Sequence, residues 1–421
     1  MSNATRILLT RPAGEPPQNL ADYRAEDGYQ ALEAAIQENS PESIIQHIED
    51  AGLRGRGGAS FPVATKWKLA AGTAADKKFV IANGGEHEPG SEKDKFLVAH
   101  YPHKVLEGIM LCGIATGANH GYLYLIKDMA EQISVAESAL EELRNANLLG
   151  DNILGSSFNF DIQIHRAPTT YVAGEETAAI DSINGGSGKP LEKPPYPGTA
   201  GVQGMPTTVN NVETLAHVAA ILRNGSEWYR SIGTASSQGT MLFTLDDRVH
   251  NPGVYELPFG CTFRDIIYGC GGGPKSGNEI RGILPALSCS YLGKEHLDTS
   301  IDHDTLRDLG TSPGCGGITF VEEGDDVVTR VHEITQFFQA EQCGQCPPCR
   351  MATSQFANIL AGVRAGKGPG YDAQIRKMAS FSKGKGRCSL IAMSTSAVTS
   401  ALEVFAEDFA KTAGAGSSDP S

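Results

Sequence analysis

Four cysteines in the C-terminal part of this chain have a spacing that suits a metal centre. Cys343, Cys346 and Cys349 lie in "EQCGQCPPCR", and Cys388 follows in "KGRCSL". Three thiolates on one tight turn can hold one face of a 4Fe–4S cubane, and a distant fourth thiolate completes the ligand set. A structural zinc site also takes four cysteines, but it usually has two separated C-x-x-C pairs. The spacing therefore favours an iron–sulfur cluster, with zinc as the alternative.

A glycine-rich stretch near the start of the chain suits the binding of a phosphate. "GLRGRGGASFPVATKWK" places Gly55, Gly57 and Gly58 beside two arginines. The backbone N–H groups of such a loop can approach a phosphate closely, and the arginines would add positive charge. An ordinary glycine-rich turn is the alternative interpretation.

Polar side chains in three later stretches suit a nucleotide or a flavin. Asn83, Glu86 and Glu88 follow an apolar strand in "VIANGGEHEPGSEKDK", at the edge where α/β sheets bind ligands. Two adjacent acids in "TTYVAGEETAAIDSINGG" open a helix, where they could cap its first turn or accept hydrogen bonds from ribose hydroxyls. Two asparagines precede an amphipathic helix in "GMPTTVNNVETLAHVAAIL" and offer hydrogen-bonding groups to the edge of a flavin ring. These acids and asparagines are Glu175, Glu176, Asn210 and Asn211.

The elements that would position these residues alternate between strands and helices. "KFVIAN" and "GYLYLI" are apolar runs typical of buried strands, and "AEQISVAESALEELRNA" is a helical stretch. This alternation favours a parallel sheet flanked by helices. From Thr240 onward, short strands, a proline–glycine turn and one helix indicate a smaller unit. Helical stretches then carry the cysteines, so we expect an α/β fold with a helical C-terminal region.

Composition excludes several classes of protein. Hydrophobic residues make up 40% of the 421 residues and charged residues 20%, as in ordinary globular chains. The net charge of −14 argues against a nucleic-acid partner. No apolar run approaches the roughly 20 residues that cross a bilayer, and the N-terminal apolar stretch is too short for a signal peptide. We therefore expect a cytoplasmic protein with reduced cysteines and no direct membrane insertion, which could lie peripherally on the inner membrane through a larger complex.

In combination and in this order, the motifs resemble those of the flavin-containing, NADH-oxidising subunit of respiratory complex I. Homologues of that subunit serve NAD-reducing hydrogenases and NAD-dependent formate dehydrogenases. The resemblance extends from about Gly52 to Leu390. It implies FMN, a 4Fe–4S cluster and NAD(H) as substrate. It also implies a Rossmann-like FMN/NADH-binding domain, a small β-grasp (ubiquitin-like) domain and a C-terminal helical bundle that carries the cluster.

The same resemblance sets the expected domain boundaries. An N-terminal extension and helix would cover 1–50, the FMN/NADH-binding α/β domain 51–236 and the β-grasp domain 237–326. The helical 4Fe–4S domain would cover 327–412, and a disordered tail would follow at 413–421.

The resemblance also implies roles for individual residues. Phe61 would stack on the adenine of NADH together with Tyr196, Glu88 would reach the nicotinamide carboxamide, and Glu176 would bind the adenosine ribose. Glu176 would also repel a 2′-phosphate, so the expected donor is NADH and not NADPH. No side chain is expected to be catalytic, because hydride transfer takes place on the flavin. The flavin site would be formed by Gly57, Gly58, Lys66, Asn83, Glu86, Tyr171, Gly174, Glu175, Asn210, Asn211 and Thr214, and the cluster would be held by Cys343, Cys346, Cys349 and Cys388.

The sequence departs from the family pattern at positions that affect the site. "NGGEHEPG" has Gly85 where the family has an aspartate, and its missing carboxylate would raise the FMN potential and favour NADH oxidation. Leu69 replaces an aromatic residue, which should cost roughly 0.5–1.5 kcal/mol of adenine stacking. Tyr196 replaces a phenylalanine, Ala173 a cysteine, and "RAPTTY" a glycine-rich run. We therefore expect NADH-dependent activity with a raised Michaelis constant.

Two main hypotheses for function follow. The first is an NADH dehydrogenase (diaphorase) module that exchanges a hydride between NADH and FMN and passes single electrons to the cluster. The second is an FMN/4Fe–4S electron-transfer subunit that no longer uses NAD(H). A zinc-stabilised scaffold is a third alternative. The sequence shows no thioredoxin-like 2Fe–2S domain, so the expected partners are a separate protein of that kind and further iron–sulfur or catalytic subunits.

Overall fold

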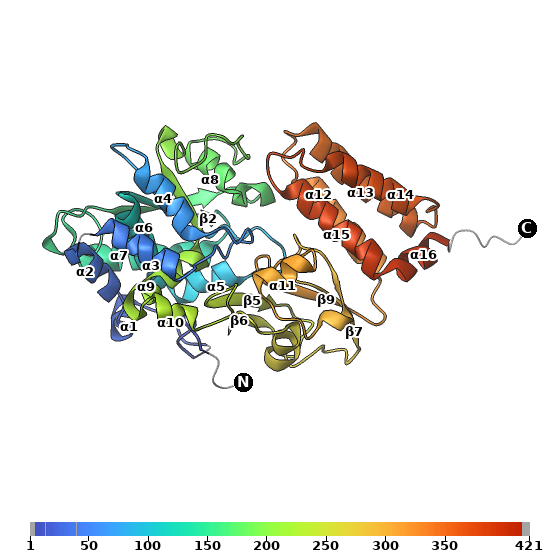
Figure 1. The fold of residues 1–421 in the computed structure, drawn as a ribbon, viewed down its shortest axis with the longest axis horizontal. Coiled ribbons are helices and arrows are strands. Elements are labelled where there is room, and N and C mark those ends of the chain that lie inside the picture. The colour runs from blue at the N-terminus through green and yellow to red at the C-terminus, as the bar shows by residue number, and fades with distance from the viewer. Residues whose placement is uncertain (1–4, 13, 39, 415–421) are drawn as a thin grey trace, which may run out of the picture.

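The computed structural model describes residues 5–12, 14–38 and 40–414, and these form three regions. Figure 1 shows a parallel sheet with its helices at one end of the molecule and the C-terminal helices at the other. A second sheet lies between them along one side. The fold is a mixed α/β fold with a parallel sheet and a helical C-terminal region, as the alternation of strands and helices predicts.

The parallel sheet consists of β1 (Phe79–Asn83), β2 (His120–Ile126), β3 (Asp161–Ala167) and β4 (Thr207–Asn211). Its strand order is β3-β2-β1-β4, and every neighbouring pair is parallel. Successive residues of β1 point to opposite faces, so Val80 and Ala82 enter one core while Phe79 and Ile81 enter another. Both faces are therefore covered, which explains why β1 is a continuous apolar run.

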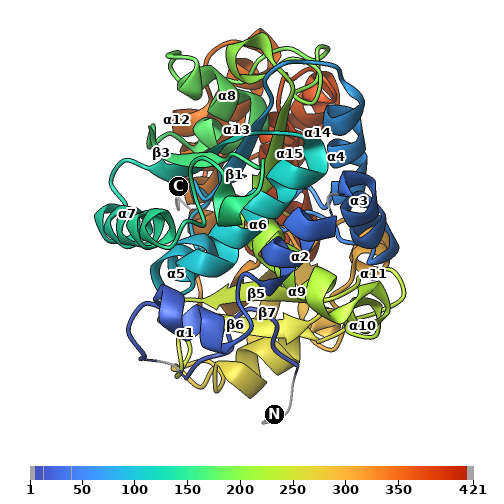
Figure 2. The same ribbon diagram turned by 90° about the vertical axis from the view of Figure 1, so that its left-hand side faces the viewer.

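Helices surround this sheet, and α6 is the most deeply buried of those in contact with it. All 15 residues of α6 are buried, as expected for a helix that is apolar around most of its circumference. Figure 2 shows α6 lying across the sheet, where it contacts β1, β2 and α9. The described residues of the predicted N-terminal segment 1–50 form three helices, α1 to α3. The helices of this region are α1 (Leu20–Ala25), α2 (Gln30–Glu38), α3 (Pro41–Asp50), α4 (Val63–Gly72), α5 (Lys93–His100), α6 (Pro102–Thr116), α7 (Ala130–Asn145), α8 (Glu176–Ile183), α9 (Val212–Asn224) and α10 (Ser226–Arg230), with short turns η1 (Ile153–Gly155), η2 (Tyr171–Gly174) and η3 (Val202–Gly204).

The second sheet has the order β6-β5-β9-β7-β8 and is mostly antiparallel. Only the pairing of β5 with β9 is parallel among its described strands. Phe243, Phe263 and Phe320 lie in its own hydrophobic core. Its elements are β5 (Thr240–Leu245), β6 (Gly253–Pro258), η4 (Asp265–Cys270), β7 (Ile280–Leu284), β8 (Leu292–Gly293), η5 (Lys294–His296), α11 (His303–Asp308) and β9 (Gly317–Glu322).

The C-terminal region is a group of helices around Phe338, Phe356, Leu360 and Val398. It comprises α12 (Val327–Glu341), α13 (Pro347–Arg364), α14 (Tyr371–Ser382), α15 (Leu390–Val404) and α16 (Ala406–Gly414). The predicted tail begins inside α16, and its residues 415–421 lie outside the described residues. No single described helix has both the length and the apolar character of a membrane span; α15 and α16 reach them only as a pair, with an 85° bend between them.

Candidate functional site

The carboxyl ends of β1 and β4 bring several of the expected site residues together. These strands are neighbours and parallel, so Asn83 lies opposite Asn211 and Ala82 opposite Asn210. Asn83 donates through Nδ2 to the Gly174 carbonyl at 2.9 Å, and Asn211 donates through Nδ2 to the Asn83 carbonyl at 3.2 Å. Asn211 also caps α9 by accepting from the Glu213 N–H. Asn210 is buried beside it and accepts from Trp67 Nε1 at 2.9 Å.

The glycine-rich loop lies against this sheet edge, but one of its arginines points elsewhere. A Cβ atom on Gly57 would lie only 3.1 Å from Asn211 Cβ, and Gly58 has φ +102°, so both positions favour glycine. Arg56 is 1% exposed and donates to the Thr240 and Gln238 carbonyls. Arg56 therefore brings positive charge to the loop as expected, and its guanidinium also holds the loop against the second sheet. Thr214 supports the same loop, because its hydroxyl accepts from the Arg56 N–H at 2.9 Å.

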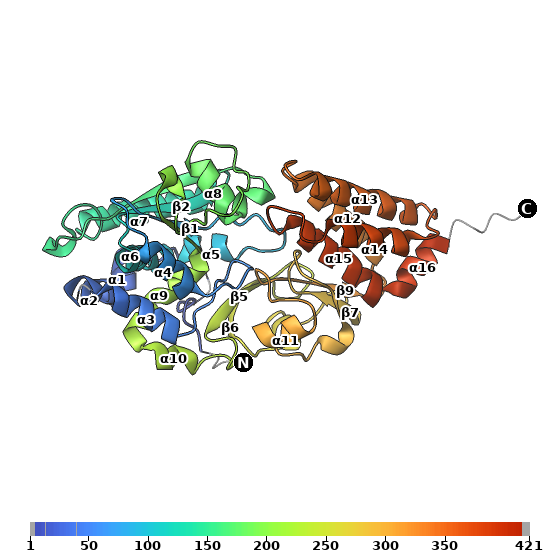
Figure 3. The same cartoon turned by 45° about the horizontal axis from the view of Figure 1, so that its top comes forward.

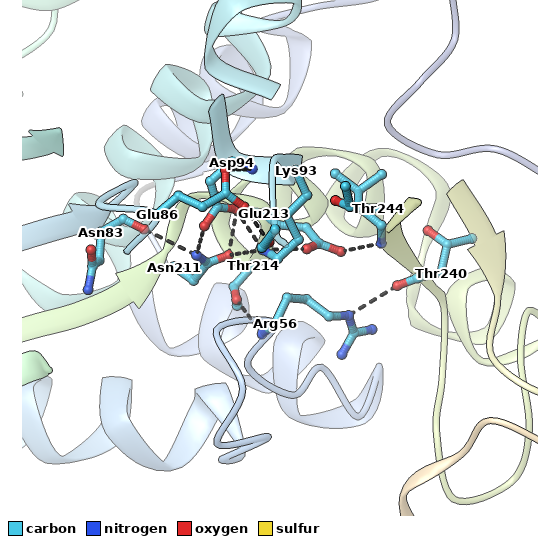
Figure 4. Close-up of polar contacts among 12 residues, drawn as sticks. Arg56, Asn83, Glu86, Lys93, Asp94, Asn211, Glu213, Thr214, Thr240 and Thr244 are labelled. Carbon is cyan, nitrogen blue, oxygen red and sulfur yellow. Dashed lines mark hydrogen bonds and ion pairs between the residues drawn. The ribbon is translucent and has the colours of Figure 1, made fainter. Parts of the chain in front are cut away.

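A buried network of charges lies behind this edge and was not foreseen from the sequence (Figure 4). Lys93 is 1% exposed, and its Nζ lies 2.6 Å from Asp94 Oδ1 and 2.9 Å from Glu213 Oε2. Although burial lowers the pKa of Lys93, these two carboxylates hold it above its ordinary value. The sequence did not predict this network, because "SEKDK" has the composition of a solvent-exposed segment. Only the proximity of α5, α9 and β5 makes it a core.

Glu86 belongs to this network and is held in one orientation. Its carboxylate accepts from the backbone N–H groups of Asp94 at 3.0 Å and Lys95 at 2.9 Å, and from the Ser91 hydroxyl. Burial, with a contribution from Asp94, raises the pKa of Glu86 to about 7. The site therefore contains a carboxyl group that can change its protonation near neutral pH.

Glu88 and Tyr171 link the sheet edge to the other two regions. Glu88 accepts from the N–H of Ser288 at 3.0 Å, from its hydroxyl at 2.9 Å, and from the Tyr171 hydroxyl at 3.2 Å. The Tyr171 hydroxyl also lies 3.3 Å from Met393 Sδ in α15, and its ring packs edge-on against Phe337 of α12. Burial, followed by the nearby Glu88 carboxylate, raises the pKa of Tyr171 well above its ordinary value.

The adjacent acids at the start of α8 have different surroundings. Glu175 is the N-cap and accepts from the N–H groups of Thr177 and Ala178. Glu176 lies between two lysines, with its carboxylate 2.8 Å from Lys66 Nζ and 2.8 Å from Lys193 Nζ. Burial raises the pKa of Glu176, but the two lysines outweigh it and keep the pKa below its ordinary value. Sequence reasoning missed Lys193 because it is 17 residues from Glu176.

Three large apolar side chains near these lysines are exposed. Phe61, Leu69 and Tyr196 are 46%, 44% and 55% exposed. Lys66 Nζ lies 5.8 Å from the centre of the Phe61 ring. Leu69 packs close to the turn after Tyr196, because a Cβ atom on Gly198 would lie 2.9 Å from Leu69 Cγ. Each exposed ring offers a surface on which a flat ligand can stack.

His87 is a further residue of this edge that the sequence did not reveal. A Cβ atom on Gly85 would lie 2.8 Å from His87 Nε2, and one on Gly174 would lie 2.9 Å from His87 Cδ2. The imidazole thus occupies the space that a side chain at position 85 would need. Burial lowers the pKa of His87 to about 4, so the ring is neutral at physiological pH. The backbone of Thr169 is near the ring, but neither buried ring nitrogen has a partner in hydrogen-bonding geometry among the described residues.

These features fit a flavin mononucleotide. Gly58 adopts a backbone conformation that favours glycine and has no side chain within 4 Å of its Cβ position, Lys66 supplies a cation beside Glu176, and the ring nitrogens of His87 need a polar partner. Buried polar groups without a partner cost about 1–3 kcal/mol each, so a bound polar ligand is the simplest way to satisfy them.

The four cysteines line one pocket, together with Val172, Pro190 and Arg387. Cys343 and Cys346 lie in the loop before α13, Cys349 in its first turn, and Cys388 just before α15. Gln345 donates to the Pro190 carbonyl at 2.9 Å, which fixes this loop against the segment after α8. Figure 3 shows this end of the helical region turned toward α8.

The electrostatics of the pocket fit a cationic centre. Burial, with contributions from the three neighbouring cysteines, raises the pKa of Cys349 to about 12, and burial also raises the pKa of Cys388. Four thiolates lining one pocket would need compensating cations, which iron ions supply. The Arg387 N–H points at Cys346 Sγ at 3.4 Å and Gln345 Nε2 at Cys343 Sγ at 3.4 Å, the type of hydrogen bond that tunes iron–sulfur centres.

Comparison with known proteins agrees with both halves of the site. Residues 48–220 match the Nuo51 FMN-binding domain, and residues 329–412 match the NADH-ubiquinone oxidoreductase-F iron-sulfur binding region. The F subunit of the Aquifex aeolicus NADH-quinone oxidoreductase is 38% identical over 411 residues, which are 96% of this chain and 94% of the relative. The corresponding F subunit of Escherichia coli is 36% identical over 419 residues, which are 97% of this chain and 94% of the relative.

Hydrogenases are also similar to this chain. An NADP-reducing hydrogenase subunit of Solidesulfovibrio fructosivorans is 35% identical over 405 residues, which are 96% of this chain and 82% of the relative. A crystal structure of an NAD+-reducing [NiFe]-hydrogenase superposes with a TM-score of 0.82 at 30% identity, covering 97% of this chain and 67% of that chain. The chain belongs to the family of NADH-quinone oxidoreductase F subunits.

Proposed function

We propose that this chain is a flavoprotein subunit that exchanges a hydride between NADH or NAD+ and FMN and passes single electrons to a 4Fe–4S cluster. The observation that carries the proposal is the position of η2. Its first residue, Tyr171, donates to Glu88 at the sheet edge, and its second residue, Val172, lines the cysteine pocket. One short segment would thus separate flavin from cluster, which favours direct electron transfer between them.

The proposed binding residues are those that the family resemblance implies. FMN, when bound, supplies the conversion between two-electron hydride chemistry and one-electron transfer. Gly57 and Gly58 would admit its phosphate or ring close to the backbone, and Asn83 and Asn211 would fix its position at the sheet edge. The full proposed flavin set is Gly57, Gly58, Lys66, Asn83, Glu86, Tyr171, Gly174, Glu175, Asn210, Asn211 and Thr214, and the cluster ligands are Cys343, Cys346, Cys349 and Cys388.

The nucleotide would bind across the exposed rings. Phe61 and Tyr196 would stack on the adenine, and Glu88 would accept from the carboxamide while Ser288 and Tyr171 hold its carboxylate in place. Glu176 would accept from the ribose hydroxyls and keep at least one lysine partner, so its charge stays compensated. This arrangement would hold the nicotinamide against the flavin, which is the protein's main contribution to hydride transfer.

The proposed domain division follows the expected boundaries at 51–236, 237–326 and 327–412. The boundaries at 236 and 326 are supported by two sheets built from separate stretches of chain, each with its own core, and by the cluster of C-terminal helices, whereas residues of the segment 1–50 share the core of the first sheet. The relatives are named as subunits, so the partners are other subunits of a larger complex. We propose that a thioredoxin-like 2Fe–2S protein is one of them, and the cytoplasmic location stays a prediction.

Anaerobic titration with NADH tests the proposal. The protein, reconstituted with FMN, iron and sulfide, should lose flavin absorbance near about 450 nm as NADH is added. If FMN is bound but millimolar NADH never bleaches it, the NAD-independent electron-transfer subunit is the correct description. Stoichiometric zinc without iron in the native protein would instead favour the zinc-stabilised scaffold.

A further inference from the structure

Residues 190–193, which we call the linking segment, lie between the cysteine pocket and the start of α8. The peptide between Pro190 and Leu191 is bonded on both of its sides. Its carbonyl accepts from Gln345 Nε2 at 2.9 Å, and its N–H donates to the Thr177 hydroxyl at 2.8 Å. Because this peptide is planar and trans, its carbonyl and its N–H point in opposite directions and cannot turn independently. One rigid peptide unit therefore joins the cysteine loop to the first turn of α8.

The next two side chains of the linking segment make the same two connections. Glu192 pairs with Arg387, beside the cysteines, at 3.6 Å. Lys193 Nζ lies 3.0 Å from Glu175 Oε1 and 2.8 Å from Glu176 Oε1, at the start of α8. The Glu192 side chain is 79% exposed, and an ion pair of that kind contributes little. The bonded peptide and the Lys193 ammonium therefore provide most of the connection.

Gln345 is the residue that ties the cysteines to the linking segment. Its Nε2 lies 3.4 Å from Cys343 Sγ, and its Oε1 accepts from Arg387 Nη1 at 2.8 Å. The Arg387 N–H in turn points at Cys346 Sγ at 3.4 Å. The position of either sulfur therefore affects the amide group that holds the linking segment.

The opposite end of the linking segment fixes the two acids that begin α8. Lys193 contacts both of them, and Glu176 is the proposed acceptor of the ribose hydroxyls. The Thr177 hydroxyl accepts from the Leu191 N–H and itself donates to the Glu175 carboxylate. Displacement of the linking segment would therefore disturb the acids to which the nucleotide is expected to bind.

We propose that Gln345 is a positioning residue for the nucleotide: through the linking segment it holds the acids of α8 in place, so that an occupied cysteine pocket strengthens nucleotide binding. This inference rests on the proposed function, because it requires a nucleotide at Glu176 and a cluster held by the cysteines. Coupling between two sites is reciprocal, so a bound nucleotide must also stabilise the cluster in its pocket. If Gln345 only packed the cysteine loop, its loss would weaken cluster retention without changing how that retention responds to the nucleotide.

A second glutamine of the same loop offers a matched control. Gln345→Met removes the hydrogen bonds of the amide and keeps the length of the side chain. Gln342 also lines the cysteine pocket, but its side chain accepts from the Gly344 N–H within the loop. Gln342→Met therefore makes the same chemical change beside the cysteines and leaves the described bonds to the linking segment intact.

Two measurements on the full chain, reconstituted with FMN, iron and sulfide, test the inference. Calorimetric titration gives the affinity for ADP-ribose, which carries the adenine and ribose groups but transfers no hydride. Loss of one hydrogen bond predicts about two- to tenfold weaker binding in Gln345→Met and unchanged binding in Gln342→Met. The second measurement is the rate at which an iron chelator removes the cluster. Saturating ADP-ribose should slow this loss in the wild type and in Gln342→Met, but not in Gln345→Met.

Equal ADP-ribose affinities in the wild type and Gln345→Met would overturn the inference. So would cluster loss that ADP-ribose slows to the same extent in these two proteins. Equal weakening of ADP-ribose binding in Gln345→Met and Gln342→Met would assign the effect to a general disturbance of the cysteine loop and would likewise reject a positioning role. Failure of the proposed function gives a different result, because the wild type would then bind no ADP-ribose, which would reject the nucleotide site and the inference together.

Discussion

Replacing Gly85 with aspartate should distort the flavin site because His87 already occupies the space. From the sequence alone, Gly85→Asp would simply restore a carboxylate and lower the FMN potential. In the structure, the new Cβ atom would lie 2.8 Å from His87 Nε2, closer than Cβ atoms approach other heavy atoms. The ring has little freedom to move, because both of its nitrogens are buried and Gly174 also lies close to its Cδ2 atom.

The expected cost follows from this overlap. Inserting atoms into a packed site typically costs about 1–3 kcal/mol, which corresponds to roughly a 5- to 150-fold loss of FMN affinity if the strain is felt in the binding-competent form. His87→Ser should remove the obstacle. The double variant Gly85→Asp/His87→Ser should then recover most of the affinity, with a coupling energy of about 1 kcal/mol or more between the two positions. Its FMN potential should be lower than that of His87→Ser, because a carboxylate disfavours a reduced, anionic flavin.

Fluorescence titration of the apoprotein with FMN measures the four affinities, and a redox titration of the bound flavin gives the potentials. Gly72→Asp serves as a control for the added charge, because a Cβ atom there would meet nothing within 4 Å. Wild-type FMN affinity in Gly85→Asp would refute the steric argument. So would a double variant that binds FMN as weakly as Gly85→Asp alone.

Three further predictions concern the cluster, the nucleotide and the buried acid. Cys346→Ser should abolish or severely alter the electron paramagnetic resonance signal of the reduced cluster, whereas Cys112→Ser, in the α6 core, should leave it intact; an unchanged signal in Cys346→Ser would remove that residue from the ligand set. Glu176→Ala should weaken NADH use and relax the rejection of NADPH by about 1–3 kcal/mol, since Lys66 and Lys193 would be freed to bind a 2′-phosphate. The ratio of kcat/KM for NADH to kcat/KM for NADPH measures this, with Glu192→Ala as the control. An unchanged ratio would leave Glu176 a structural role only. Because the pKa of Glu86 is raised from 4.5 to about 7 in the folded protein, the folded state retains a proton that the unfolded chain loses, and stability should fall by up to about 3 kcal/mol as pH rises through that window. The melting temperature should therefore fall less between pH 5 and pH 8 in Glu86→Gln than in the wild type. An equal fall in the two proteins would contradict the raised pKa.

Features that depend on local spacing could be predicted from the amino-acid sequence. Three cysteines in one turn plus a fourth before a helix predict a cluster, because ligand spacing along a chain limits what geometry the ligands can reach. The apolar run that forms β1 predicts a buried parallel strand, and Asn83 at its end predicts a place at the ligand-binding edge. Glu175 at the start of α8 is a helix cap, as one of the two interpretations of that stretch predicted.

The pairing of distant charges and rings, in contrast, emerges only when the chain is folded. The sequence predicts that Lys93 is a surface residue, but in the fold α9 places Glu213, 120 positions later in the chain, against it. The sequence indicates that Arg56 adds positive charge to the loop, but only the fold shows that its guanidinium donates to carbonyl groups of the second sheet. His87 fills the space left by Gly85, which no spacing rule reveals, because the two residues meet through a turn of the backbone. Such interactions join elements that are far apart in sequence or depend on the exact path of a loop, and their energies depend on burial that exists only after the chain has folded.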